Sequence, residues 1–161
     1  MIICIEGIDG CGKTTVANAL AKEFGCEVIS FPNDSAYTGP LIRAYLRKEW
    51  HTSFYGAEMQ NDAPELMQYA SALTFQALQI ANRMELMPKI QAAAFNGDNL
   101  ILCRYWQSAW VYGQLDGLSR EWLEQTHATI VQPDINVLLD APLLEDPVGI
   151  CLKRLDRKSV V

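Results

Sequence analysis

A glycine-rich loop near the start of the chain has the residue types needed to bind a polyphosphate. The apolar stretch Ile2–Glu6 runs into the pattern G-x-x-x-x-G-K-T, which begins at Gly7 and ends in Lys13-Thr14. Glycines let such a loop curl until backbone N–H groups converge on phosphate oxygens, and a lysine reaches the β- and γ-phosphates. The threonine hydroxyl is a ligand for Mg²⁺, so the pattern predicts binding of ATP with Mg²⁺. The residues expected to contact ATP are Gly7, Ile8, Asp9, Gly10, Cys11, Gly12, Lys13, Thr14 and Thr15.

The elements that would position this loop alternate between short apolar strands and helical stretches. Strands are expected at 2–6, 26–31, 99–103 and 135–140. Helices are expected from the loop to about Gly25, at 39–48, at 64–95 with a kink or interruption at Pro88, after an N-cap at Ser119, and from Pro147. This alternation predicts an α/β fold of the P-loop type, with a parallel sheet covered by helices on both faces. Ligands of such sheets bind at the carboxyl ends of the strands.

Length, charge and composition exclude several classes of protein. The 161 residues, half of them apolar and a fifth charged, fit a single globular domain. No long apolar run or basic leader indicates membrane insertion or secretion. The five cysteines lack C-x-x-C spacing, which favours a reducing, cytoplasmic location. A net charge of −6 argues against a nucleic-acid-binding surface.

Further motifs follow the expected strands in a fixed order. They are the acid-bearing loop start Glu6–Gly10, Phe31-Pro32, Ala81-Asn82-Arg83, Cys103-Arg104-Tyr105 with Ser108 and Tyr112, and Pro133-Asp134 before the last strand. Their order and spacing resemble the thymidylate kinase family, whose members transfer the γ-phosphoryl group of ATP to dTMP. The resemblance extends over essentially the whole chain and implies a nucleoside monophosphate kinase fold, with small nucleotides as the partners.

The resemblance implies a role for each matching residue. Lys13, Arg104 and the lid residues Arg154 and Arg157 would act on the transferred phosphoryl group, while Thr14 and Glu6 would hold Mg²⁺. Arginine suits phosphate because its planar fork binds two oxygens and stays charged. The substrate-binding residues would be Asp9, which accepts a hydrogen bond from the 3′-hydroxyl, with Phe31, Pro32, Arg83, Arg104, Tyr105, Ser108 and Tyr112. Arg43 and Phe75 are expected to join them as substitutes for family residues that this chain lacks. Surface ion pairs remain the alternative for Arg83 and Arg104, and a core or rim position for Tyr105, Ser108 and Tyr112.

The chain departs from the family pattern at four places. Cys103 replaces an acid, and because Mg²⁺ prefers oxygen ligands, Glu6 on the adjoining strand is expected to supply the carboxylate. Asp34 stands where the family often has an arginine that binds the acceptor phosphate, and its carboxylate would repel that phosphate unless Arg43 reaches over. Gln79 replaces a phenylalanine that stacks on thymine, with Phe75 as the expected substitute. The chain stops within the expected lid, so a single kinase domain over 1–161 would lack the last helix and strand.

Three functions are consistent with these motifs. The first is phosphorylation of dTMP to dTDP. The second is a deoxynucleoside kinase, which needs a carboxylate base near the 5′-hydroxyl of its substrate. Such enzymes carry this acid in a Glu-Arg-Ser motif, and no such motif follows the second expected strand. The third is a non-catalytic nucleotide-binding protein, favoured by Cys103 and Asp34. The segment 70–87 is apolar on more than one face, which allows a homodimer interface or simple burial.

Overall fold

The structure is a computed structural model that describes residues 1–47, 49 and 64–140, with the side chains of 64–68 outside the description. The chain divides into two compact units. The first contains Met1–Ser30, Ala93–Arg104 and the described residues from Pro133 onward. The second contains the described residues of Phe31–Ala92 together with Tyr105–Gln132.

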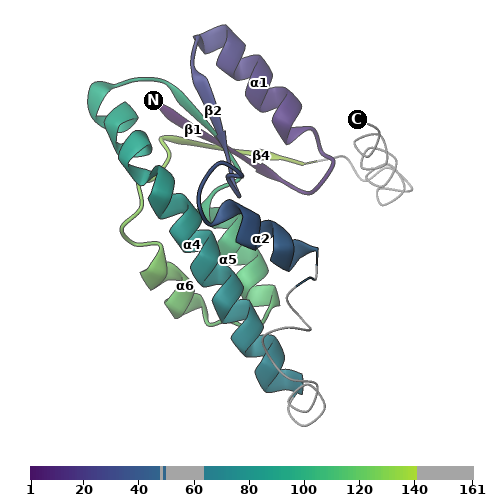
Figure 1. Ribbon diagram of the computed structural model, residues 1–161. Helices are drawn as coiled ribbons and strands as arrows, with labels where there is room; N and C mark the ends of the chain where they lie inside the picture. The colour runs from purple at the N-terminus through teal and green to yellow at the C-terminus, as the bar shows by residue number, and fades with distance from the viewer. Residues whose placement is uncertain (48, 50–63, 141–161) are drawn as a thin grey trace. The chain divides into compact units, whose positions relative to one another are not determined.

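A four-stranded parallel sheet forms the centre of the first unit (Figure 1). Its strands lie in the order β2-β3-β1-β4, with bounds β1 (Ile2–Gly7), β2 (Glu27–Ser30), β3 (Leu100–Cys103) and β4 (Ile135–Leu139). The register pairs Ile5 with Cys103 and Glu6 with Leu138. The parallel α/β fold predicted from the sequence is therefore confirmed, and β1 adjoins β3 as expected.

Helix α1 (Lys13–Phe24) packs on one face of this sheet (Figure 1). Its Ala17 and Ala21 lie one turn apart and join a buried cluster with Ile3, Ile5, Ile101 and Cys103. These two small side chains allow the helix to approach the strands closely. The helix ends where Gly25 takes the left-handed conformation, with φ 61° and its N–H bonded to the Ala21 carbonyl. The predicted helix end near Gly25 is confirmed.

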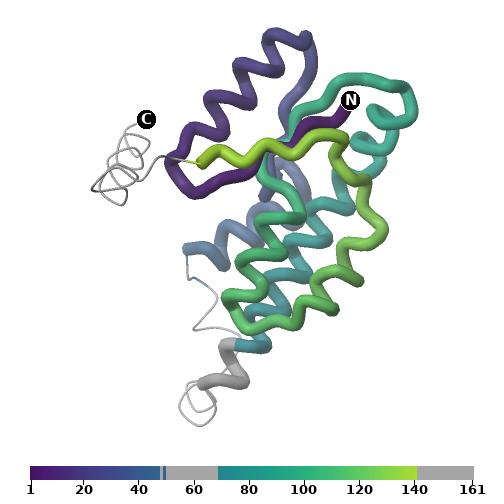
Figure 2. The backbone as a smooth tube through the Cα atoms, turned by 180° about the vertical axis from the view of Figure 1, so that it is seen from behind, coloured from purple at the N-terminus to yellow at the C-terminus, as the bar shows by residue number. Residues whose placement is uncertain are grey.

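Helices make up the second unit, and α2 and α5 both lie beside the long helix α4 (Figures 1 and 2). Their bounds are α2 (Gly39–Leu46), α4 (Pro64–Asn96), α5 (Trp106–Leu115) and α6 (Arg120–Thr126), the last residues of α4 belonging to the first unit. No described helix has the length and hydropathy that a bilayer crossing needs.

Close packing between α5 and α6 requires a glycine. A Cβ at Gly113 would lie 2.8 Å from the Cδ2 atom of Leu123, which is itself fully buried. The start of α6 matches the sequence prediction, because the Ser119 side chain accepts a hydrogen bond of 3.1 Å from the backbone N–H of Trp122. Local sequence signals therefore place α6, and a small residue lets it pack.

Helix α4 continues through Pro88, so the predicted alternative of an interruption is wrong. Pro88 removes one backbone donor, which leaves the Met84 carbonyl without its usual partner. Both residues are exposed, so water can satisfy that carbonyl and the helix tolerates the loss. The helix predicted at 39–48 is shorter than expected, because α2 ends at Leu46. The helix predicted from Pro147 falls outside the described residues.

Candidate active site

The loop between β1 and α1 has the backbone shape of an anion cradle. Gly7, Gly10 and Gly12 have φ values of 146°, 78° and 96°. At Gly7 a Cβ would lie 2.6 Å from the Leu139 carbonyl oxygen, so no other residue fits there without displacing the backbone of β4. Gly12 directly precedes α1, whose first N–H groups have no partners within the helix. These N–H groups and the helix dipole favour a bound phosphate.

The side chain of Lys13 lies within the curl of this loop. It is buried, and its Nζ donates a 2.5 Å hydrogen bond to the Ile8 carbonyl. The same Nζ lies 3.8 Å from the Cys11 Sγ and 3.9 Å from the Asp9 carboxylate. The ammonium group is thus held at the centre of the loop, while Thr14 at the start of α1 is exposed.

Buried polar groups gather where β1, β2 and β3 end. Glu6 and Cys103 are only 9% and 5% exposed, and Ser30 pairs in register with Cys103 and hydrogen-bonds to its thiol. Burial raises the pKa of the Cys103 thiol, and the nearby charges of Lys13 and Arg104 offset this only in part. Cys103 is therefore an uncharged thiol at neutral pH.

The donor set at this end of the sheet suits a hard cation only through its oxygens. A neutral thiol is a poor ligand for Mg²⁺, which prefers carboxylate and hydroxyl oxygen. Glu6 supplies a carboxylate beside Cys103, and Thr14 supplies a hydroxyl at the start of α1. The residues present therefore fit Mg²⁺, with the Glu6 carboxylate and the Thr14 hydroxyl as its ligands and the Cys103 thiol left out.

Arg104 follows β3 with an unusual backbone conformation. Among the described residues it is the only non-glycine residue with a positive φ, at 62°. Its N–H bonds to the Ile5 carbonyl at 2.9 Å, and its guanidinium forms an ion pair with the carboxylate of Asp9. A non-glycine residue in this region costs about 1 kcal/mol or more, and such strain clusters at functional sites. The pair joins two residues predicted to contact substrate.

In the second unit, Arg83 is held rigidly inside the protein. It is 2% exposed, so it is not part of a surface ion pair. Its Nη1 and Nη2 each donate a 2.8 Å hydrogen bond, to the carbonyls of Gln79 and Tyr105. The guanidinium carbon lies 5.9 Å from the centre of the Phe31 ring, and the Phe31 and Tyr105 rings are 5.4 Å apart. Three predicted substrate residues thus form one cluster.

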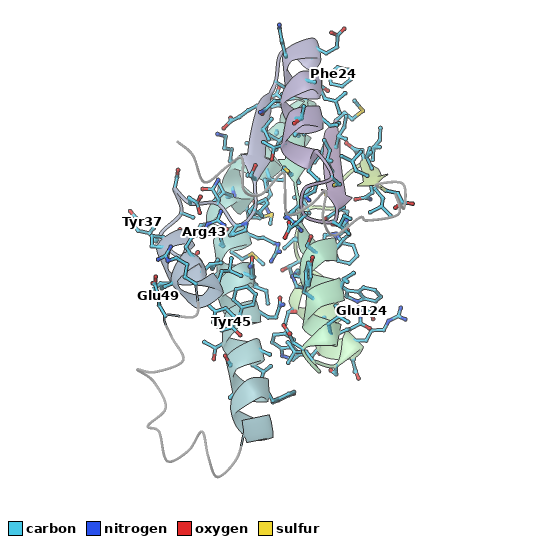
Figure 3. All side chains as sticks on the ribbon, turned by 90° about the vertical axis from the view of Figure 1, so that its right-hand side faces the viewer. Phe24, Tyr37, Arg43, Tyr45, Glu49 and Glu124 are labelled. Atoms are coloured by element: carbon cyan, nitrogen blue, oxygen red, sulfur yellow. The ribbon has the colours of Figure 1, made fainter. Side chains whose placement is uncertain are left out.

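Arg43 reaches over Asp34, the possibility that the sequence left open. The two side chains form a two-point ion pair, with Nε to Oδ1 at 2.6 Å and Nη2 to Oδ2 at 3.1 Å. Figure 3 shows Arg43 and Tyr45 on the short helix α2, with Tyr37 in the loop before it. The negative charge of Asp34 is therefore neutralised by Arg43, which reduces the repulsion that the carboxylate would exert on a bound phosphate.

The remaining predicted substrate residues of the second unit differ in exposure. The Phe75 ring stacks on Tyr45 at 4.2 Å, so one of its faces is already covered. Tyr105 is fully buried, Ser108 is half-buried and Tyr112 is 45% exposed. Pro32, half-buried, follows Phe31 through a cis peptide bond. The predicted lid residues Arg154 and Arg157 fall outside the described residues.

Sequence reasoning missed a hydrogen-bond network around Asn82. Its side chain and that of Glu85, both on α4, bind the segment from Asn33 to Thr38. A local signal exists only for the turn that the network holds: the Asn-Asp-Ser run after Phe31-Pro32 is typical of a turn in which a side chain bonds to the backbone. Asn33 makes this turn, accepting a 3.1 Å bond from the Ser35 N–H.

Comparisons with known proteins identify one family. The sequence matches the family model for thymidylate kinase over residues 5–160. It is 36% identical over 166 aligned positions to the probable thymidylate kinase of Thermococcus gammatolerans, covering 99% of this chain and 72% of that protein. It is also 36% identical, over 149 positions, to the probable thymidylate kinase of Pyrococcus horikoshii, covering 89% and 66%.

A solved structure agrees at the level of the fold. The thymidylate kinase of Candida albicans superposes with a TM-score of 0.66 at 24% identity, covering 99% of this chain and 77% of that one. The phosphate loop, the strand order and the family match all lead to one assignment. The chain belongs to the thymidylate kinase family.

Proposed function

We propose that this protein transfers the γ-phosphoryl group of ATP to dTMP, giving ADP and dTDP. The observation that carries the proposal is the glycine cradle with Lys13 held in its curl, in a chain that belongs to the thymidylate kinase family. Phosphoryl transfer needs little covalent chemistry from a protein, because positioning and charge neutralisation supply most of the rate enhancement. The donor and acceptor groups can therefore be assigned from charge and geometry.

The first unit would bind the donor. The N–H groups of the loop and the ammonium of Lys13 would bind the β- and γ-phosphates. Mg²⁺, held by Thr14 and Glu6, would neutralise charge on the same phosphates. Arg104 would exchange its ion pair with Asp9 for the phosphoryl group in transfer, which frees the Asp9 carboxylate to accept a hydrogen bond from the 3′-hydroxyl of the acceptor.

The second unit would bind the acceptor nucleotide. Arg83 has its fork fixed by two carbonyls, so it can present its charge without losing conformational freedom on binding. Phe31 and Pro32 would form the floor of the pocket. The side chains proposed to line the deoxyribose and base are Phe75, Tyr105, Ser108 and Tyr112.

We also propose that the two units act as one kinase domain, since donor and acceptor must meet for transfer to occur. Self-association through α4 is a further proposal, supported by the exposed apolar residues Tyr69 and Met84 on that helix. A cytoplasmic location stays a prediction.

One observation favours a second candidate, a nucleotide-binding protein without kinase activity. Cys103, an uncharged thiol, stands where an acid is expected from the family pattern. If Glu6 does not replace that acid, ATP would bind without transfer.

The test is a substrate panel with the purified protein, ATP and Mg²⁺. We expect dTMP to be phosphorylated faster than dUMP, dCMP, dGMP, dAMP or thymidine, as measured by ADP release. Turnover of thymidine without turnover of dTMP would contradict the proposal and indicate a deoxynucleoside kinase. ATP binding by calorimetry, with no turnover of any member of the panel, would instead favour the second candidate.

A further inference from the structure

Two polar side chains on α4 hold the segment that precedes α2. The first is Asn82, which is fully buried. Its Oδ1 accepts a 2.7 Å hydrogen bond from the Asn33 N–H, and its Nδ2 donates 3.0 Å bonds to the Asn33 carbonyl and the Thr38 hydroxyl. The amide thus uses both its donor and its acceptor, which neither a carboxylate nor an apolar side chain could do.

The second side chain is Glu85, nearly one turn further along α4. Its carboxylate accepts hydrogen bonds from the N–H groups of Tyr37 and Thr38, at 2.5 and 3.0 Å, and from the Thr38 hydroxyl at 2.6 Å. These bonds lower the pKa of Glu85. The Thr38 hydroxyl therefore links the two α4 residues, accepting from Asn82 and donating to Glu85. We call Asn82, Glu85 and Thr38 the loop clamp.

The loop clamp fixes the start of α2. Thr38 immediately precedes this helix, and Gly39 is its first residue. A Cβ at Gly39 would lie 2.5 Å from the Asn33 carbonyl oxygen and 2.9 Å from the Cα of Asp34, so the loop is closed tightly on itself. The position of Asp34 is therefore determined by the same contacts that determine where α2 begins.

The other end of α2 is also tied to α4. The Tyr45 ring stacks on Phe75, and the Ser71 hydroxyl donates a 3.1 Å hydrogen bond to the Tyr45 hydroxyl. Arg43 lies between these attachments and forms its ion pair with Asp34. An exposed ion pair contributes little by itself and holds no fixed geometry without support. The support here comes from α4 through the loop clamp.

We propose that Asn82, Glu85 and Thr38 are positioning residues that set the Asp34–Arg43 pair for binding the phosphate of the acceptor nucleotide. None of the three needs to touch the substrate. The inference rests on the proposed function, because Arg43 can bind an acceptor phosphate only if the acceptor is a nucleoside monophosphate such as dTMP. It predicts that damage to the loop clamp weakens acceptor binding and leaves ATP binding unchanged.

The decisive variant is Thr38→Val, which keeps the side-chain shape and removes the hydroxyl that joins Asn82 to Glu85. We expect the KM and the calorimetric Kd for dTMP to rise about tenfold, with kcat and the KM for ATP within about twofold of wild type. Thr38→Ser, which restores the hydroxyl, should bring both values back to within about twofold.

Two further variants and one control complete the experiment. Glu85→Gln removes the charge that holds two N–H groups and should raise the Kd for dTMP about as much as Thr38→Val. Asn82→Asp keeps the acceptor for the Asn33 N–H but loses both donors, and should act in the same direction. The matched control is Glu124→Gln, which removes the carboxylate paired with Arg120 on α6 at 2.7 Å and should change neither constant.

The outcomes separate this inference from the proposed function. An unchanged Kd for dTMP in Thr38→Val and Glu85→Gln, equal losses toward ATP, or no recovery in Thr38→Ser would overturn the inference. Loss of folding in both variants, seen in thermal melts, would show a structural role and overturn it too. A wild-type protein that binds dTMP without phosphorylating it overturns the proposed function, while the Kd ratios still decide the inference. A wild type that binds no nucleoside monophosphate overturns both.

Discussion

The phosphate loop and the acceptor-side helices are built in different ways. In the first unit, backbone conformation shapes the site: Gly7, Gly10 and Gly12 take positive φ, and the Lys13 side chain is held within the loop that they form. In the second unit, side chains hold one another and the backbone, as Arg83 and the loop clamp do. Removing one residue should therefore abolish the first site, whereas changes in the second should have graded effects.

The largest expected effect tests the first half of this comparison. Lys13→Ala removes the charge at the centre of the loop and should lower kcat for dTMP phosphorylation by about 10³-fold, with the fold intact. Lys22→Ala, at the far end of the same helix and exposed, is the matched control and should leave kcat unchanged. A loss of less than about tenfold in Lys13→Ala would show that the backbone cradle alone accounts for the donor site.

A graded effect is expected at the buried arginine of the second unit. Arg83→Lys cannot bind the Gln79 and Tyr105 carbonyls together, because an ammonium lacks the planar fork. One buried carbonyl would be left without its partner, at a cost of about 1–3 kcal/mol in the free energy of unfolding. We expect lower stability in chemical denaturation and a Kd for dTMP raised about 10- to 100-fold, with ATP binding unchanged. Equal weakening toward ATP would contradict the assignment of Arg83 to the acceptor side.

A substitution at Cys103 should improve Mg²⁺ binding in the first unit. Cys103→Asp adds a carboxylate beside Glu6 at the end of β3, and an oxygen ligand suits Mg²⁺ better than a neutral thiol. We predict a rise of several-fold in kcat at limiting Mg²⁺, with Cys103→Ser as the control for removal of sulfur alone. An unchanged or lower rate in Cys103→Asp would show that Glu6 already supplies what the metal site needs.

The smallest expected effect concerns His127 in the second unit. Its Nδ1 lies 2.7 Å from the Leu123 carbonyl, and burial lowers the pKa of the ring below its ordinary value of 6.5. The unfolded chain therefore binds a proton more readily than the native state, so stability falls as pH drops below 6.5, by at most about 1.4 kcal/mol per pH unit. Denaturation curves of wild type and His127→Asn from pH 7.5 to 5 would measure this. If the variant shows the same slope, the proton is bound elsewhere.

The sequence predicted the first unit better than the second, and the reason is physical. Backbone sites need glycines at fixed spacing, and strands and helix ends have local signals, so the phosphate loop, the four strands and the helix end at Gly25 could be found from the sequence. The loop clamp joins Thr38 to Asn82 and Glu85, which lie 44 and 47 positions further along the chain, and no local pattern encodes those long-range bonds. The prediction of an interruption at Pro88 was wrong for a related reason. The free-energy cost of a proline inside a helix depends on whether water reaches the carbonyl that loses its partner, and only the fold determines that exposure.

Transfer of the phosphoryl group from ATP to dTMP is tested directly by a product analysis of the wild-type chain with ATP, Mg²⁺ and dTMP. Chromatographic separation of the nucleotides would measure ADP and dTDP together over time. We predict that both form at equal rates, that both form about 10³-fold more slowly with Lys13→Ala, and that omission of dTMP stops ADP production. Release of ADP without dTDP, or dTDP formation by Lys13→Ala within about tenfold of the wild-type rate, would contradict this prediction.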